Sequence, residues 1–276
     1  MTAPLVARSA VDGPRATAFG KLARMAPQEH EPNTISPALV SAFAPTGTLR
    51  ASINVGNPIL ANAPAGGGEP VGVSIDLARE FARRLGVGVE LVVFARAADS
   101  VDAVKDERAD IGFFAIDPAR SDWLLFTAPY VLIEGSYLVG ESSMLTDNAQ
   151  IDGAGHRISV GSGSAYDLFL TREIRQAEIV RFRGAAPALE AVRAGDVEVA
   201  AGIRQLLEGE AARAPGVRVL PGRFMVIQQA MGIPAGRGTE AQALLAAFVE
   251  QMKANSFVAN ALTRHRIDGA LVAPAA

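Results

Sequence analysis

The chain has 276 residues, of which 29 are acidic and 26 basic, so its formal charge at pH 7 is −3. A charge this close to neutral excludes the strongly basic surface that nucleic-acid binding requires. The sequence contains no cysteine, which excludes disulfides, thiolate nucleophiles and cysteine-ligated zinc. Its three histidines, His30, His156 and His265, stand in unrelated contexts and form no H-x-x-x-H pair, so we predict no metal and no cofactor.

The N-terminal residues 1–36 carry four prolines and no periodic apolar pattern, and we expect them to form a flexible extension. Their basic residues are scattered and are followed by no apolar run of the kind found in secretory signals. Taken as written, the sequence therefore predicts a cytoplasmic protein. No run of 18 apolar residues occurs, so we also expect no membrane span.

From residue 36 onward, strand and helix patterns alternate. Between Ser74 and Leu85 the apolar residues recur with helical period, and Gly86 follows as a stop. Residues 109–116 are nearly all apolar, as in a buried parallel strand. The alternation indicates βαβ units and an α/β protein. We predict helices at 36–43, 74–85, 100–107, 166–174, 186–194, 240–253 and 258–264, and strands at 49–55, 87–94, 109–116, 131–139, 157–160, 179–182, 197–201 and 224–233.

Six short motifs then follow one another in a recognisable order. They are LRASI at 49–53, VGVSIDLA at 71–78, ADIG at 109–112, DPAR at 117–120, FTAPY at 126–130 and VGSGSA at 160–165. In this order and spacing the chain resembles the family-3 extracellular solute-binding proteins, which are the polar amino acid receptors of ABC importers. The resemblance covers about residues 46–268 and implies a periplasmic protein with an importer permease as its partner.

The same resemblance implies a type II periplasmic-binding-protein-like α/β fold with two lobes. Each lobe is a mixed β-sheet flanked by helices, and two strands that cross between the lobes act as the hinge. We place lobe 1 at residues 45–133 plus 230–268 and lobe 2 at residues 136–224.

Carried over to this sequence, the carboxylate-binding arginine of the family corresponds to Arg120. A guanidinium presents a planar pair of N–H donors to a carboxylate, and a helix N-terminus presents free backbone N–H groups. For Arg120, a surface ion pair with Asp117 or Asp122 is the alternative. The glycine-serine loop at 161–164, which precedes a predicted helix, is equally explained by an ordinary strand-to-helix turn. The donors that the resemblance assigns to lobe 2 are Ser162, Gly163, Ser164 and Ala165.

Three positions depart from the family pattern. The acidic residue that meets the amine of an amino acid is missing after the strand at 197–201, where the sequence reads Ala-Gly-Ile-Arg. Phe113 stands where small polar residues are usual, and Ile59 where an aromatic residue is common. These departures favour a carboxylate without an amine, or one whose amine is met by Glu134 or Asp117.

Further candidates interrupt apolar segments near the predicted crossings. Glu134 and Gln228, with its neighbour Gln229, suggest a polar cleft floor, although alternation on a half-exposed strand explains them as well. Tyr166 and Phe113 suit an apolar or stacking wall, with core packing as the alternative. Asn57, in the turn Gly-Asn-Pro after the first strand, completes the predicted ligand-binding set.

The sequence thus predicts a monomeric solute-binding protein that closes by hinge bending on a small carboxylate-bearing ligand, an amino acid or an organic acid. Two alternatives remain open. One is an enzyme resembling the cyclohexadienyl and arogenate dehydratases, with Glu134 as the acid and Arg120 holding the substrate carboxylate. The other is a cytoplasmic binding or sensor protein that has no importer.

Overall fold

The computed structural model describes residues 35–64 and 66–276. The extension predicted at 1–36 lies outside the described residues except for Ile35 and Ser36. Ser36 caps the first helix, because its side chain accepts a hydrogen bond from the backbone N–H of Leu39 at 3.3 Å. The strands are β1 (Thr48–Asn54), β2 (Gly88–Phe94), β3 (Ile111–Ala115), β4 (Leu124–Phe126), β5 (Val131–Gly140), β6 (Arg157–Gly161), β7 (Glu178–Phe182), β8 (Val199–Ile203), β9 (Val217–Val219), β10 (Met225–Pro234) and β11 (Leu271–Val272).

Helices separate most of these strands along the chain. They are α1 (Pro37–Phe43), α2 (Val73–Leu85), α3 (Ala97–Lys105), α4 (Pro118–Ser121), α5 (Ala165–Glu173), α6 (Ala185–Arg193), α7 (Arg204–Arg213), α8 (Thr239–Ala254) and α9 (Phe257–Arg264), with short 3-10 turns η1 (Asn148–Gln150) and η2 (Ala235–Arg237).

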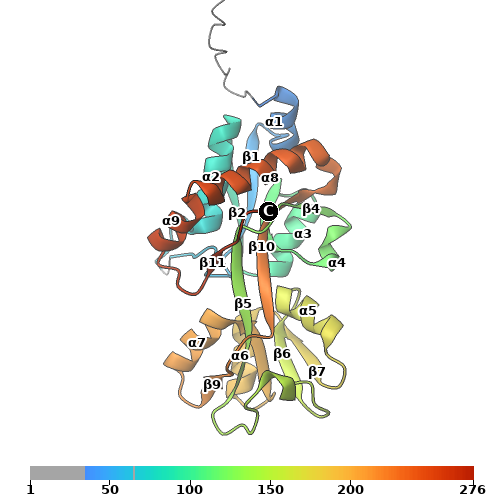
Figure 1. Ribbon diagram of the computed structural model, residues 1–276, viewed down its shortest axis with the longest axis vertical. Coiled ribbons are helices and arrows are strands. Elements are labelled where there is room, and N and C mark those ends of the chain that lie inside the picture. The colour runs from blue at the N-terminus through green and yellow to red at the C-terminus, as the bar shows by residue number, and fades with distance from the viewer. Residues whose placement is uncertain (1–34, 65) are drawn as a thin grey trace, which may run out of the picture. The chain divides into compact units, whose positions relative to one another are not determined.

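The strands pair in the order β2-β1-β3-β10-β5-β8-β6-β7. β1 is parallel to β2 and β3, and β6 is parallel to β7 and β8. We call β1, β2 and β3, with the loops and helices that directly follow them, the first strand group, and β6, β7 and β8, with theirs, the second strand group. β10 and β5, antiparallel to each other, join the two, because β10 pairs with β3 and β5 pairs with β8. Figure 1 shows β5 and β10 running between helices α1, α2, α8 and α9 at one end and α5, α6 and α7 at the other.

Helix α2 shows why the local sequence produces these elements. Its buried side chains fall on one face, and Gly86 ends the helix in the left-handed conformation at φ 70°, which glycine adopts without steric cost. In the core, the ring of Phe81 lies 4.8 Å from that of Phe43 and 4.9 Å from that of Phe248. These contacts pack α1, α2 and α8 against one another.

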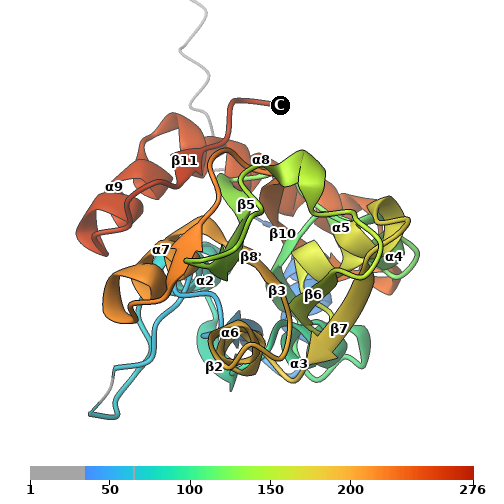
Figure 2. The ribbon, with the colours of Figure 1, turned by 90° about the horizontal axis from the view of Figure 1, so that it is seen from below.

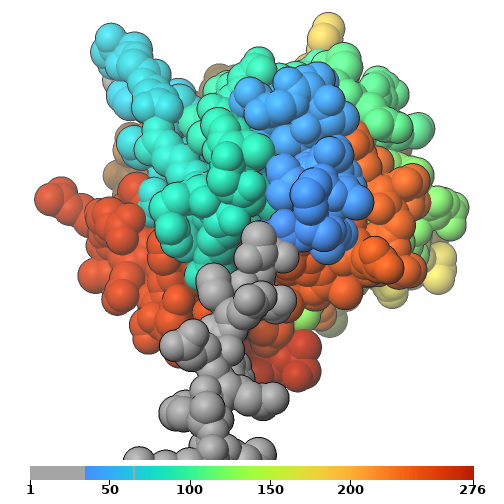
Figure 3. Space-filling view, turned by 90° about the horizontal axis from the view of Figure 1, so that it is seen from above, coloured from blue at the N-terminus to red at the C-terminus, as the bar shows by residue number. Residues whose placement is uncertain are grey.

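The loop between β1 and α2 projects from the body in Figures 2 and 3, where it is coloured cyan. Its first residues, which directly follow β1, remain at the body. Asn57 is buried there, and its side-chain oxygen accepts from the backbone N–H of Ile59 at 3.2 Å.

The mixed α/β fold predicted from the sequence is confirmed, with differences at element ends and with five elements that were not predicted, α4, α7, β4, β9 and β11. The helix predicted at 100–107 begins at Ala97, and the strand predicted at 197–201 occupies 199–203. The shift of β8 follows from its pairing, in which Ile203 lies opposite Gly135 of β5. The lobe boundaries stay a prediction, because residues 35–276 cluster as one compact unit.

Candidate functional site

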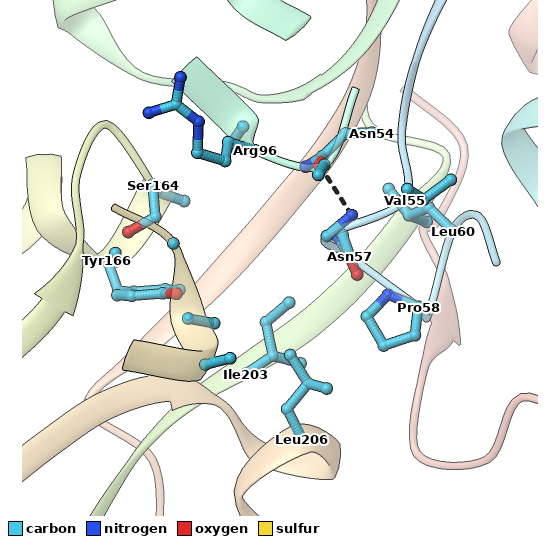
Figure 4. Close-up of a pocket in the computed structure, with 18 of the residues that line it drawn as sticks. Asn54, Val55, Asn57, Pro58, Leu60, Arg96, Ser164, Tyr166, Ile203 and Leu206 are labelled. Atoms are coloured by element: carbon cyan, nitrogen blue, oxygen red, sulfur yellow. Dashed lines mark hydrogen bonds between the residues drawn. The ribbon is translucent and has the colours of Figure 1, made fainter. Parts of the chain in front are cut away.

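A cavity of about 690 Å³ lies between the two strand groups. From the first group it is lined by the start of the β1–α2 loop, by β3 and by the β2–α3 junction, and from the second by the start of α5 and by residues along α6 and α7. Figure 4 shows Asn57 and Pro58 on one side of this space and Ser164 and Tyr166 on the other. A ligand held here would contact both groups at once.

Arg120 is the buried cation of this cavity. It lies in the short helix α4 and is only 4% exposed. Its Nη1 donates to the carbonyl oxygen of Ala115 and its Nη2 to that of Gly163, each at 2.9 Å. Within the described part of the chain, no carboxylate lies within ion-pair distance of it. Burial lowers the pKa of Arg120 to about 10, because the charged form is poorly solvated.

The start of α5 faces Arg120 from the second strand group. Ser164 caps the helix, since its Oγ accepts from the N–H of Asp167 at 3.1 Å. The backbone N–H groups of Ala165 and Tyr166 are the first two of the helix and have no acceptor among the described residues. Both residues line the cavity, so two free donors and the positive end of the helix dipole are available there.

Apolar side chains form much of the remaining wall. Phe113 and Phe114 come from β3, Tyr166 from α5, and Ile203 and Leu206 from the β8–α7 junction. The ring of Phe113 meets the ring of Tyr130 edge-on at 6.2 Å, which fixes its orientation. Burial raises the pKa of Tyr166, so its hydroxyl stays protonated at neutral pH.

The cavity brings together most, but not all, of the residues predicted from the sequence. The predicted residues that line it are Asn57, Phe113, Arg120, Ser162, Ser164, Ala165 and Tyr166, and those that do not are Asp117, Gly163, Glu134 and Gln228.

Gln229 takes the place predicted for Gln228. Successive side chains of a strand point to opposite faces, and β10 exposes Gln228 while burying Gln229 against the cavity. The alternation with buried Ile227 is the signal in the sequence that favours Gln229.

Asp117 and Gly163 do not line the cavity but form contacts with α4, α5 and Arg120. Asp117 caps α4 through the N–H of Ala119 at 2.9 Å and pairs with Arg172 of α5 at 3.0 Å. The surface pair between Arg120 and Asp117, considered from the sequence, is therefore replaced by a pair with another arginine. Gly163 contributes its carbonyl oxygen to Arg120.

Glu134 lies on β5 and does not line the cavity. Its two carboxylate oxygens accept from Arg204 and Arg223, each at 2.7 Å. These hydrogen bonds hold the pKa of Glu134 below its ordinary value. A carboxyl held in its ionised form and outside the cavity is poorly suited to the role of general acid that the dehydratase alternative requires.

The pairing of Glu134 with Arg204 and Arg223 leads us to predict how stability depends on the pH and on Glu134. Because its pKa is lowered in the folded state, it stabilises the fold above the ordinary glutamate pKa, and this contribution disappears as pH falls through the lowered value. Glu134→Gln should lower the free energy of unfolding by about 1 kcal/mol at pH 7 and by much less at pH 3. Urea unfolding at both pH values measures this, with exposed Glu173→Gln as the control. An equal loss at both pH values would contradict it.

Sequence reasoning missed Asn54, Arg96 and Leu206 as lining residues. Asn54 ends β1, and Arg96 follows β2 and pairs with Asp99 at 2.6 Å. Ligands of open α/β sheets bind beyond the carboxyl ends of the strands. Asn54 and Arg96 could therefore have been predicted as lining residues from their places at or just after the carboxyl ends of predicted strands.

Solved structures with a similar fold include the solute receptor for L-cysteine of Neisseria gonorrhoeae, at 21% identity and a TM-score of 0.72, over 83% of this chain and 94% of that one. A mutant of ArgBP from T. maritima matches at 18% identity and a TM-score of 0.71, over 83% and 99%. The ancestral amino acid-binding protein AncCDT-1, a precursor of cyclohexadienyl dehydratase, matches at 21% and 0.68, over 82% and 98%. Identities this low show the fold alone.

A search of curated proteins gave no match. In the described ranges, no helix combines the length and apolar character needed to cross a membrane. The family described as bacterial extracellular solute-binding proteins, family 3, matches residues 58–265. Because this match spans most of the chain and the fold agrees with it, the chain belongs to the bacterial extracellular solute-binding proteins of family 3.

Proposed function

We propose that the protein is a substrate-binding receptor that closes its two lobes on a small carboxylate-bearing ligand. The observation that supports this most directly is Arg120, a buried guanidinium that lines the cavity and has no carboxylate partner among the described residues. Burying an unpaired charge is costly, and a bound carboxylate offsets that cost through two parallel charge-assisted hydrogen bonds.

The second strand group supplies the other half of the clamp. The free N–H groups of Ala165 and Tyr166 face the same cavity, at the positive end of α5. Arg120 and the start of α5 belong to different lobes in the division that we predict. A carboxylate between them would be held from both sides.

Contacts between the predicted lobes support closure by hinge bending on β5 and β10. Arg120 reaches Gly163 at 2.9 Å, and Asp117 pairs with Arg172 at 3.0 Å. A Cβ added to Gly163 would lie 2.9 Å from the Cβ of Ala98 at the start of α3. In an open state these three contacts separate, while the strands that link the lobes persist.

The test combines a ligand screen with solution scattering. Saturating a tight site with one member of a panel of amino acids and organic acids should raise the melting temperature, because binding at 100 times Kd stabilises by about 2.7 kcal/mol. The radius of gyration of the full chain should fall when that ligand is added. An unchanged radius at saturation would contradict closure, and no stabilisation by any carboxylate would contradict the proposed ligand class.

We further propose that the receptor acts outside the cytoplasm and delivers its ligand to an ABC-importer permease. The family to which the chain belongs is described as extracellular, and the cytoplasmic location expected from the N-terminal sequence gains no support from it. No contact in the cavity favours the dehydratase or the cytoplasmic sensor, so neither is proposed.

A further inference from the structure

We infer that the cavity selects an apolar carboxylate that lacks an ammonium group, so that its ligand is an organic acid rather than a free amino acid. This inference rests on the proposed function, because it assumes that Arg120 receives the carboxylate. It is carried by the charges that line the cavity and by their partners.

The acids that line the cavity are already neutralised by arginines. In residues 35–64 and 66–276, these acids are Glu190 of α6 and Glu210 of α7. Glu190 pairs with Arg193 at 3.0 Å, and Glu210 pairs with Arg193 at 3.3 Å and with Arg213 at 3.1 Å. Each carboxylate is thus already balanced by an arginine, and neither presents an unpaired negative charge to the ammonium group of a ligand.

The carbonyl oxygens nearest the carboxylate site already receive a cationic donor. Those of Ala115 and Gly163 both accept from Arg120. An ammonium group next to the ligand carboxylate would need such acceptors, since it carries three donors and a full charge. Sharing these oxygens with Arg120 would hold two cations side by side in a desolvated site, which is costly.

The remaining charges at the cavity are positive and would repel an ammonium group. Arg120 is buried in it, and Arg96 and Arg183 line it as well. Arg96 is balanced by Asp99 at 2.6 Å, whereas no ion pair of Arg183 is found within the described residues. Net positive charge favours an anion and disfavours the zwitterion that a free amino acid presents.

Beyond the carboxylate site, the wall is suited to an apolar ligand body. Phe113, Phe114, Ile203 and Leu206 present carbon surface from both strand groups. Gln229, only 5% exposed, is a neutral polar group on the same wall, and its side-chain amide makes no hydrogen bond within the described part of the chain. A single hydroxyl or keto oxygen on the ligand would satisfy this amide without adding charge.

The experiment is calorimetry on the full chain with matched ligand pairs that differ only in the amine. The pairs are L-alanine and propanoate, L-leucine and 4-methylpentanoate, and L-phenylalanine and 3-phenylpropanoate. We expect the acid of at least one apolar pair to bind at least tenfold more tightly than its amino acid. Equal binding, or preference for the amino acid in every pair that binds, overturns the inference while the proposed function stands.

Two variants at Ile203 separate charge from shape. Ile203 lines the cavity and is the N-cap of α7, where aspartate and asparagine are both favoured. Ile203→Asp should shift the preference toward the amino acid at least tenfold. Ile203→Asn, whose side chain has the shape of aspartate without the charge, should not. The same shift in both variants would overturn the charge argument. If no carboxylate of the panel binds the wild-type chain, both the inference and the proposed ligand class fail; if L-arginine alone binds, only the inference fails.

Discussion

Replacing Arg120 with alanine should lower the affinity for the carboxylate ligand by about 2 to 5 kcal/mol, which is a loss of roughly 30-fold to several thousand-fold. The reason is that truncation leaves a desolvated anion without its cation in a cavity where Arg120 has no carboxylate of its own. Calorimetry with the best ligand of the screen measures the loss.

Two further variants sharpen this result. Arg120→Lys should recover only part of the affinity, since an ammonium cannot reproduce the two parallel hydrogen bonds of a guanidinium. Arg183→Ala is the matched control, because it removes an exposed arginine from the same cavity. Wild-type affinity in a folded Arg120→Ala protein would contradict the carboxylate assignment, and an equal loss in Arg183→Ala would reduce it to a general effect of charge.

The second large effect is expected at Gly163, where a methyl group should hinder closure. Gly163 has φ +71°, and an added Cβ would lie 2.9 Å from the Cβ of Ala98 in the other strand group. Overpacking of this kind costs about 1–3 kcal/mol. In the proposed closure the two methyl groups meet only when the lobes are together, so Gly163→Ala should weaken ligand binding about tenfold or more, as calorimetry would measure.

The control for backbone strain is Gly195→Ala. Gly195 has a similar φ of +77°, but nothing lies within 4 Å of its added Cβ. Both alanine variants should lose about 1 kcal/mol of stability from the left-handed conformation, and only Gly163→Ala should lose affinity. Adding Ala98→Gly to Gly163→Ala should restore binding. Failure of this rescue, or equal loss of affinity in Gly195→Ala, would show that the contact does not control closure.

Much of the fold could be predicted because the signals are local. The helical period from Ser74 to Leu85 and the stop at Gly86 appear in the structure as α2 and its left-handed cap. The apolar run at 109–116 contains β3 (Ile111–Ala115), whose residues are all buried. Such patterns depend only on neighbours along the chain, so they can be read without the tertiary structure.

The candidate site was harder to predict, as two polar residues on the linking strands show. Glu134 and Gln228 both interrupt apolar runs, and both were expected at the cleft. Glu134 instead pairs with Arg204 and Arg223, which lie about 70 and 89 positions away along the chain. Partners so distant in sequence leave no mark in the local pattern of hydrophobic and polar residues.

The sequence by itself determined the α/β class, the order of most elements and the family, because these follow from periodicity, turn residues and motif order. It also marked Arg120 and the loop at 162–165 as candidate residues. Only the tertiary structure decided the partners of the charged residues. Arg120 donates to two carbonyl oxygens, and Asp117 forms an ion pair with Arg172. The physical reason is that the cost of burying a charge depends on every group packed around it, and those groups come from segments far apart in the sequence, as Ala115 and Gly163 do around Arg120.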